Sequence, residues 1–408
     1  MRAEVAIVGA GPAGIFAARA AAGKAQVLLL DDNIRPGGQI WRRNPLLTAL
    51  PGNVTLKTGV RVLGPWQEHS LLLETPNGPS ILEYDRLILA TGARELFLPF
   101  KGWTLPNVIG AGALQALIKE GWNIRGKRIV IAGTGPLLLA VAALARKQGG
   151  KVLGVLEQAP ANRVLAFACQ TALYPSKAAQ AIKLGSAAFL NYRTNSFVVE
   201  AIGNKTLTAV ACQIRQKQHH IDCDIAAVAY GLVPNNELAV LLRCETRDGY
   251  VVVDHDQRST VANLFAAGEI TGIGGVEKSM IEGEIARLRS TGQTADHCWR
   301  NRNRSRQFVK RLEKTFRLSP ALKKLATDDT ILCRCEDVSF GEVKEFQNWR
   351  LAKLQRRIGM GPCQGRVCGP AFAFLCGNGA SDVEAVSIRP PVFATHLQNL
   401  LPKENENL

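Results

Sequence analysis

The chain has 408 residues, of which 47% are hydrophobic and 21% charged, and its formal net charge at pH 7 is +16. This length supports two or three domains with full cores, and this composition is typical of a globular protein and does not favour disorder. The chain opens without the pattern of a secretory signal, and its longest apolar run, residues 137–145, is far shorter than a bilayer requires. We therefore predict no transmembrane segment and a cytoplasmic location, where cysteines stay reduced.

The first predicted unit is a strand, a glycine-rich turn and a helix. Residues 5–8 form a short buried strand, residues 15–22 an alanine-rich helix that ends near Gly23, and a second strand over 26–30 leads into Asp31. The turn has the G-x-G-x-x-G spacing, which permits a tight turn, close approach of a pyrophosphate and close packing of helix on strand. An acid 22 positions after the first glycine (31 minus 9) is placed to bind an adenosine ribose. We predict that a dinucleotide binds here, contacting Gly9, Gly11, Pro12, Ala13, Gly14 and Asp31.

A second fingerprint lies at residues 128–136, followed by a predicted helix to Gln148 and a strand over 152–156. Its third glycine is replaced by Leu138, a branched side chain where close packing or a pyrophosphate favours none. The occupant is therefore open among NAD, another adenine nucleotide and no ligand in a vestigial pocket. An acid in the ribose position would repel a 2'-phosphate and so favours NAD over NADP. The predicted contacts are Gly133, Gly135 and Glu157.

Two such units in one chain resemble the superfamily of thioredoxin reductases and related disulfide reductases. In that superfamily the first unit binds FAD, and the second, inserted into the first, binds a nicotinamide nucleotide. Residues 86–92 are similar to the strand and A-T-G turn that leave the FAD domain, residues 36–39 to a loop near the flavin, and residues 260–269 to the returning segment, whose final acid is usually Asp. The resemblance implies further flavin contacts from Gly38, Gln39, Ala90, Thr91, Gly92, Gly268 and Glu269. No C-x2-C or C-x4-C pair precedes Cys169, which excludes disulfide-reductase chemistry.

The sequence offers no recognisable acid–base machinery. None of the six histidines stands beside a nucleophile or a carboxylate in a known arrangement. We therefore assign no catalytic residue, which fits hydride chemistry carried out by a flavin. Residues 277–280 follow two glycines and predict the start of a helix that faces the flavin, from which Lys278 would touch the isoalloxazine ring.

The positive charge is concentrated between Arg300 and Lys324, where ten basic residues face one acid, Glu313, a local balance of +9. The simplest interpretation is a solvated helical linker, and a surface that docks onto an acidic face of a partner subunit is the alternative. We expect no nucleic-acid binding, because no helix-turn-helix, zinc finger or aromatic RNA-binding motif accompanies the run.

Four cysteines near the end of the chain form two close pairs. They are Cys333, Cys335, Cys363 and Cys368. Four thiolates suit zinc or an iron-sulfur cluster, but zinc sites usually space their pairs as C-x2-C, so we favour a [2Fe-2S] cluster. Glycines around the second pair, and Arg334, Arg357 and Arg366 close by in sequence, would offset thiolate charge and stabilise a reduced cluster. The segment between the pairs, residues 340–357, predicts one or two helices.

The closest resemblance covers nearly the whole chain. Residues 90–108, 133–139 and 334–338 are similar to the large flavoprotein subunit of opine oxidases, hydrogen cyanide synthases and D-hydroxyproline or proline dehydrogenases. Residues 359–369 resemble the [2Fe-2S] domain named after bacterioferritin-associated ferredoxin. The resemblance implies a partner flavoprotein similar to glycine or D-amino-acid oxidases, which oxidises a C–N bond, and a small ferredoxin-like subunit.

These observations predict an α/β fold with two Rossmann-like domains, the second inserted into the first, plus a small helical [2Fe-2S] domain. The expected function is electron relay in a heteromeric amino-acid, imino-acid or opine dehydrogenase. A free-standing NADH-dependent ferredoxin-type reductase and a non-enzymatic docking or iron-handling protein are the alternatives. The predicted domains are FAD-binding (1–108 and 245–298), second nucleotide-binding (109–244), basic linker (299–329), [2Fe-2S] (330–380) and C-terminal tail (381–408).

Overall fold

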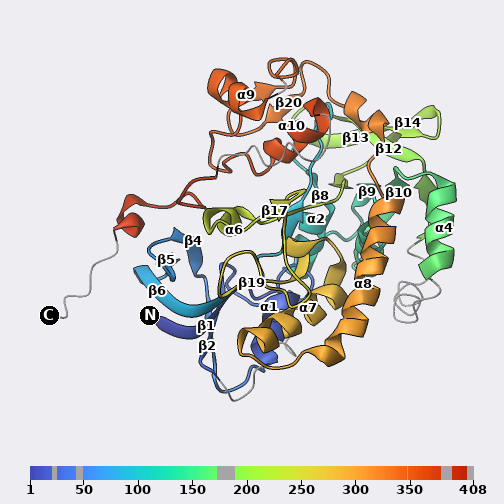
Figure 1. Cartoon of the computed structure of the whole chain (residues 1–408). Helices are drawn as coiled ribbons and strands as arrows, with labels where there is room; N and C mark the ends of the chain where they lie inside the picture. Colours follow the sequence, from blue (N-terminus) through green and yellow to red (C-terminus); the bar gives the residue numbers. More distant parts are fainter. Residues whose placement is uncertain (21–24, 43–48, 172–188, 347, 378–387, 402–408) are drawn as a thin grey trace. The chain divides into compact units, whose positions relative to one another are not determined.

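The computed structural model describes residues 1–20, 25–42, 49–171, 189–346, 348–377 and 388–401 (Figure 1). By its internal contacts the chain divides into two units. The first comprises residues 1–94, 233–309 and 387–408, and the second comprises residues 95–232 and 310–386. Along the sequence the second unit therefore interrupts the first, as the predicted inserted domain requires. The functional boundaries proposed from the sequence stay a prediction.

The first unit is built on a seven-stranded sheet in the order β3-β2-β1-β6-β5-β4, with β19 paired to β6. Its parallel strands are β1 (Arg2–Val8), β2 (Val27–Asp31), β3 (Val54–Thr58), β6 (Gly78–Leu89) and β19 (Leu264–Ala266). β4 (Arg61–Pro65) and β5 (Ser70–Thr75) complete it in antiparallel pairs. Every residue of β2 and β19 is buried, because helices cover a parallel sheet on its faces.

Helix α1 (Pro12–Arg19) packs against α7 (Gly275–Ser290) in this unit (Figure 1). The two helices can approach closely because residue 283 is glycine. A Cβ at Gly283 would lie 2.1 Å from the carbonyl oxygen of Ala13. α1 begins three residues before the predicted start at Ile15, and its predicted end near Gly23 lies outside the described residues. The unit also contains α6 (Glu237–Leu241), β17 (Thr246–Arg247), β18 (Tyr250–Val251), the 3-10 turns η2 (Gly268–Thr271) and η5 (Leu397–Leu400), and most of α8 (Asp296–Thr315).

The second unit has a parallel five-stranded sheet in the order β11-β10-β9-β15-β8. Its strands are β8 (Val108–Gly110), β9 (Arg128–Gly133), β10 (Lys151–Glu157), β11 (Tyr192–Thr194) and β15 (Ile225–Ala229), with helices α2 (Ala111–Lys119), α3 (Leu137–Lys147) and α4 (Ala161–Thr171). An antiparallel sheet of β12 (Ser196–Gly203), β13 (Leu207–Ile214) and β14 (Lys217–Asp222) follows β11. β7 (Ala93–Glu95) pairs with β16 (Leu232–Pro234) where the chain crosses between units. The predicted pair of Rossmann-like sheets is confirmed.

The cysteine-bearing part of the second unit has its own small core of Leu332, Trp349, Phe372 and their neighbours. Its elements are η3 (Pro320–Lys324), β20 (Ile331–Cys333), β21 (Val338–Ser339), α9 (Trp349–Arg356) and α10 (Cys368–Cys376). Among the described residues of the predicted helical stretch 340–357, which leave out residue 347, only α9 is a helix, and residues 341–345 form turns instead. Trp103 ties this part to the rest of the unit, since its Nε1 donates to the carbonyl of Ile331 at 2.6 Å.

The basic stretch is not uniformly solvated. Arg302 on α8 is 5% exposed and donates to Gln257 Oε1 at 3.0 Å and to the carbonyl of Asp254 at 2.8 Å. Arg306 reaches the carboxylate of Glu282 on α7 at 3.3 Å. The interpretation of a fully solvated linker is therefore wrong for these two arginines, which hold α8 onto the first unit. In the part of the chain that the structure describes, no helix is both long and apolar enough to cross a bilayer.

Candidate functional site

The first glycine turn joins β1 to α1 and leaves its backbone open to a ligand. Gly9 has φ +105°, and a Cβ there would lie 2.3 Å from the carbonyl oxygen of Ala90. At Gly11, by contrast, an added Cβ would have no heavy atom within 4 Å. Gly11 is the N-cap of α1 and makes no side-chain capping hydrogen bond. The first-turn N–H groups and the helix dipole therefore form a ready site for a phosphate group.

Asp31 lies at the end of β2, beside this turn. Its Oδ2 accepts a hydrogen bond from the backbone N–H of Ala10 at 2.6 Å, and its Oδ1 accepts from the backbone and side-chain amides of Asn33, both at 2.8 Å. Burial raises the pKa of Asp31 above its ordinary value, and these hydrogen bonds oppose that shift. The sequence pattern located Asp31 but missed Asn33, which orients the carboxylate.

The predicted flavin loop packs directly on the glycine turn. The backbone N–H of Gly37 donates to the carbonyl of Ala10 at 2.8 Å, and a Cβ at Gly38 would lie 3.2 Å from the Cα of Gly11. Gln39 is exposed just beyond this contact. Residues 37–39 therefore lie beside the first fingerprint, from which they are more than twenty positions apart in sequence.

The A-T-G turn after β6 is fixed by a residue that the sequence did not single out. Thr91 Oγ1 donates to the carbonyl of Asn235 at 2.6 Å, and Asn235 Nδ2 donates to the carbonyl of Thr91 at 3.0 Å. The backbone N–H of Asn235 donates to the carbonyl of Gly92, also at 3.0 Å. These hydrogen bonds of Asn235 therefore join the segment by which the chain leaves the first unit, at Thr91 and Gly92, to the segment by which it returns.

The returning segment ends at Gly268 and Glu269, at the start of η2. Gly268 has φ +84°, and a Cβ there would lie 2.8 Å from the Cβ of Ala13 on α1. This close approach places the segment against the first-fingerprint helix. Glu269 is half-buried, and burial raises the pKa of its carboxyl group while Lys278 and the backbone N–H of Gly275 oppose that shift.

An ionic network centred on the buried Glu282, with side chains from α7 and α8, supports this turn. Glu282 Oε2 accepts from Lys278 Nζ at 2.7 Å, from Thr271 Oγ1 at 2.7 Å and from the backbone N–H of Gly268 at 3.1 Å. Its Oε1 receives Arg306 at 3.3 Å. Burial opposes the charge on Glu282, but Lys278 and Arg306 outweigh it and lower the pKa of Glu282 below its ordinary value. Neither Glu282 nor Arg306 was predicted from the sequence.

Lys278 was predicted to touch the flavin, but it is 2% exposed and fully engaged by protein oxygens. Its Nζ donates to the carbonyl of Gly268 at 2.8 Å and to Thr271 Oγ1 at 3.0 Å, besides Glu282. Burial lowers the pKa of Lys278, yet three acceptors around Nζ require the ammonium form, which has three donors. The geometry gives Lys278 a supporting role beneath Gly268.

The first unit therefore fits the FAD that the sequence predicts, because the open position at Gly11 lies between the uncapped start of α1, Asp31 and the loop at Gly38. We expect Asp31→Ala to weaken FAD retention by about tenfold, or about 1.4 kcal/mol, because it removes the acceptor of the Ala10 and Asn33 hydrogen bonds. Asp32→Ala, at the exposed neighbouring position, is the matched control and should retain FAD. FAD released on dilution, measured by fluorescence, checks this, and equal loss from both variants would contradict it.

In the second fingerprint, the acid lies fully buried. Glu157 is 0% exposed, and its carboxylate accepts from Thr134 Oγ1 at 2.8 Å, from the backbone N–H of Gly135 at 2.7 Å and from that of Ala159 at 2.8 Å. Gly133, with φ +138°, lies against the carbonyl oxygen of Ala229, 1.9 Å from where its Cβ would be. Leu138 is also 0% exposed and belongs to the core between α3 and the sheet, which explains a branched residue there.

The four C-terminal cysteines converge from two segments. Cys368 is hydrogen-bonded to Cys333 and to Cys363, and Cys363 contacts Cys335. Hydrogen bonding from Cys368 lowers the pKa of Cys333 to about 6 and that of Cys363 to about 5, with backbone N–H groups adding to both shifts. The backbone N–H of Gly359 points at Cys333 Sγ at 3.5 Å. Backbone N–H groups point at Cys333, Cys335 and Cys363. Neighbouring sulfurs with N–H donors fit a thiolate-bound metal centre.

A glycine lies against the quartet, while two neighbouring arginines contact other side chains. A Cβ at Gly361 would lie 2.3 Å from the Cβ of Cys335, so only glycine fits there. The guanidinium of Arg334, between the first two cysteines, lies over the ring of Trp103 at 6.0 Å. Arg357, predicted to offset sulfur charge, pairs instead with Glu336 at 3.0 Å.

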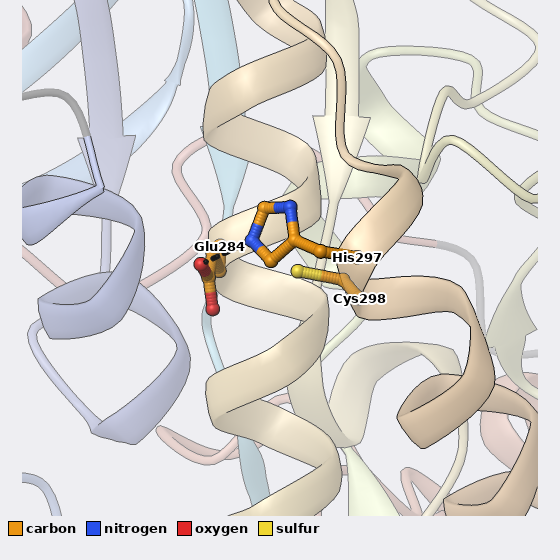
Figure 2. Close-up of side chains that lie close together, drawn as sticks. All are labelled: Glu284, His297 and Cys298. Carbon is orange, nitrogen blue, oxygen red and sulfur yellow. Dashed lines mark hydrogen bonds and ion pairs between the residues drawn. The ribbon is translucent and has the colours of Figure 1, made fainter.

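A third group of polar side chains lies between α7 and the start of α8. Figure 2 shows Glu284, His297 and Cys298 with their ligand atoms turned toward one another, all within 4.8 Å. His297 Nε2 lies 3.1 Å from Glu284 Oε1, and burial together with Glu284 raises the pKa of Cys298 to about 12. The His297 ring and the Cys298 thiol both bond to the carboxylate of Glu284, and these contacts join the two helices.

Residues 3–295 match a protein family described as pyridine nucleotide-disulphide oxidoreductase. An opine oxidase subunit of Rhizobium meliloti is 29% identical, over 95% of this chain and 95% of that protein. Hydrogen cyanide synthase subunit HcnB of Pseudomonas aeruginosa is 30% identical, over 89% and 90%. The predicted resemblance to these proteins is confirmed.

Among solved structures, L-proline dehydrogenase from P. horikoshii superposes with a TM-score of 0.71 at 18% identity, over 98% of this chain and 80% of that chain. This similarity covers the architecture of nearly the whole chain. The likeness of residues 359–369 to a ferredoxin-type domain stays a prediction.

Proposed function

Because the chain belongs to the pyridine nucleotide-disulphide oxidoreductase family of flavin-dependent enzymes, we propose that it relays electrons as one subunit of a heteromeric dehydrogenase. The substrate class that we propose is an amino acid, an imino acid or an opine, oxidised at a C–N bond. The observation that carries the proposal is the presence, in one chain, of a fitting flavin site and a convergent cysteine quartet.

FAD, when bound, takes up two electrons, and a [2Fe-2S] cluster passes electrons singly, so the two together convert one kind of transfer into the other. The residues of this chain do the positioning. The start of α1 and Gly11 would hold the pyrophosphate, and Asp31 would hold the adenosine ribose. Gly268 and Glu269, supported by Lys278 and Glu282, would hold the ribityl side of the flavin.

The quartet would hold the cluster. Hydrogen bonds from Cys368 lower the pKa of Cys333 and Cys363, while those same bonds raise the pKa of Cys368 and burial raises that of Cys335. The proposal therefore rests on the convergence of the four sulfurs, and a bound metal would have to displace the thiol protons. The N–H of Gly359 would stabilise negative charge on the sulfur of Cys333. Zinc is the alternative metal that the same four thiolates could bind.

The relatives support the heteromeric part of the proposal, since the opine oxidase protein and HcnB are each named as one subunit of an enzyme. We propose that substrate is oxidised on a second flavoprotein, similar to glycine or D-amino-acid oxidases, and that a small ferredoxin-like protein is a further partner. None of the ten cysteines is in a disulfide, which is in keeping with the reducing, cytoplasmic location that we propose.

Reconstitution with the proposed flavoprotein partner tests this function. The chain should be co-purified with that partner, and an amino acid or opine should bleach the flavin of this chain only when the partner is present. Anaerobic absorbance spectra of each protein by itself and of the pair give the readout. Amine oxidation at full rate by the isolated chain would contradict the relay function, and purification without flavin would favour the non-enzymatic alternative.

A further inference from the structure

The second Rossmann-like sheet has a defined place for the adenosine half of a dinucleotide. In such units the ribose hydroxyls bond to the acid at the end of the second strand, and the pyrophosphate lies on the glycine turn. Here that place is bounded by Thr134 and Gly135 in the turn after β9, and by Glu157 and Gln158 at the end of β10.

Residues 316–319, which we call the covering segment, lie across this place. Gln158 grips the segment at two points: its Nε2 donates to the carbonyl of Arg317 at 3.2 Å, and its Oε1 accepts from the backbone N–H of Ser319 at 3.0 Å. Thr134 Oγ1 also lies 3.4 Å from the carbonyl oxygen of Phe316. Thr134 and Gln158, which would face the nucleoside, therefore form hydrogen bonds with the covering segment instead.

Apolar contacts anchor both ends of the covering segment. The ring of Phe316 meets the ring of Phe167 edge-on, with centroids 5.1 Å apart, and lies 4.0 Å from where a Cβ of Gly135 would be. Leu318 packs on the core of the second unit, next to the buried Leu322 and Leu325. The equivalent glycine of the first fingerprint, Gly11, has open space at the same position.

The acid that would bind the ribose is already saturated. A carboxylate has about four acceptor sites. Those of Glu157 face four donors, namely the hydroxyls of Thr134 and Tyr192 and the backbone N–H groups of Gly135 and Ala159. Thr134, Glu157 and Gln158 are 8%, 0% and 3% exposed. A ribose would have to displace both the covering segment and these internal bonds.

We infer that the covering segment determines cofactor specificity by excluding NADH and NADPH from the second unit, which leaves Glu157 as a structural residue. The inference rests on the proposed function and deepens it: the electrons of the flavin come from the substrate by way of the partner, and not from a reduced nicotinamide. The predicted free-standing NADH-dependent reductase would then be excluded for this chain.

The experiment uses the isolated, flavin-loaded chain. NADH and NADPH are added anaerobically, binding is followed by calorimetry, and flavin bleaching is followed at its visible absorbance band. We expect neither saturable binding nor bleaching up to millimolar nucleotide. Hydrogen exchange of residues 133–135 and 316–319, with and without NADH, should be unchanged. Saturable bleaching by NADH, or loss of protection in 316–319 on adding NADH, would overturn the inference.

A variant in which the covering segment is released should gain NADH binding. Phe316→Ala combined with Gln158→Ala removes the aromatic anchor and both side-chain hydrogen bonds, and should tighten NADH binding by at least about tenfold. Phe197→Ala is the matched control, because Phe197 is also a half-buried phenylalanine that packs on the core of the second unit. It should leave NADH binding undetectable. A double variant that keeps its flavin spectrum and melting temperature but gains no binding would also overturn the inference.

These outcomes are separate from the test of the proposed function. A chain that excludes NADH but fails to accept electrons from any partner would refute the relay and leave the covering segment's role standing. A chain that bleaches with NADH and also with substrate plus partner would keep the relay and refute the exclusion.

Discussion

Anaerobically purified protein is expected to contain iron and inorganic sulfide in equal amounts, about two atoms of each per chain, and no zinc. Replacing Cys368 by Ala should remove essentially all of this iron. Cys368 has the central place, because it contacts both Cys333 and Cys363 and so joins the two pairs. FAD should be retained, since the flavin site is built from the first unit.

Cys376→Ala is the matched control for this loss. Cys376 ends the same helix, α10, that Cys368 begins, and it is a free cysteine outside the quartet. Iron and sulfide analysis with low-temperature paramagnetic resonance gives the comparison. Zinc in the wild-type protein, or iron retained by Cys368→Ala, would end the case for electron relay through this centre.

The parts of the fold that the sequence predicted well are local. The first fingerprint, its strands and Asp31 lie within some thirty residues, and their spacing alone specifies a strand, a turn and a helix. The order of two such units then indicated the inserted second unit. The cysteine quartet was found in the same way, because closely spaced thiols in a chain without disulfides most often bind a metal.

What the sequence could not predict depends on contacts between distant residues. Thr91 and Asn235 are 144 positions apart, and Gln158 and Arg317 are 159 apart. Glu282 and Arg306 look like ordinary charges on surface helices. Only the folded structure shows that Glu282 is buried against Gly268 and Thr271 and that Arg306 pairs with it. The covering segment lies within the basic stretch 300–324, whose charge by itself indicates a linker.

Glu282→Gln is expected to destabilise the first unit by about 3–5 kcal/mol, because Lys278 would keep its charge in a buried site without a carboxylate. At about 2–4 °C per kcal/mol for a protein unit of this size, the melting temperature should fall by roughly 10 °C. FAD should also be released more easily, since the carboxylate accepts the N–H of Gly268. Thermal unfolding followed by circular dichroism and flavin fluorescence measures both effects.

Glu284→Gln provides the comparison on the same helix. Glu284 is partly exposed and bonds to the exposed His297, so its loss should cost less than about 1 kcal/mol. A melting temperature that falls equally in both variants would show that the buried network carries no special stability.

The same network predicts how stability depends on pH. Lys278 and Arg306 lower the folded-state pKa of Glu282 below its ordinary value of 4.5, so its contribution is fully present above that pH. As the pH falls through the lowered pKa, the carboxylate takes up a proton and the contribution is lost. Wild-type protein should therefore lose stability below pH 4.5 more steeply than Glu282→Gln, and the gap between the two should narrow. A gap that stays constant from pH 7 to the acid limit would mean that Glu282 is not charged in the folded protein.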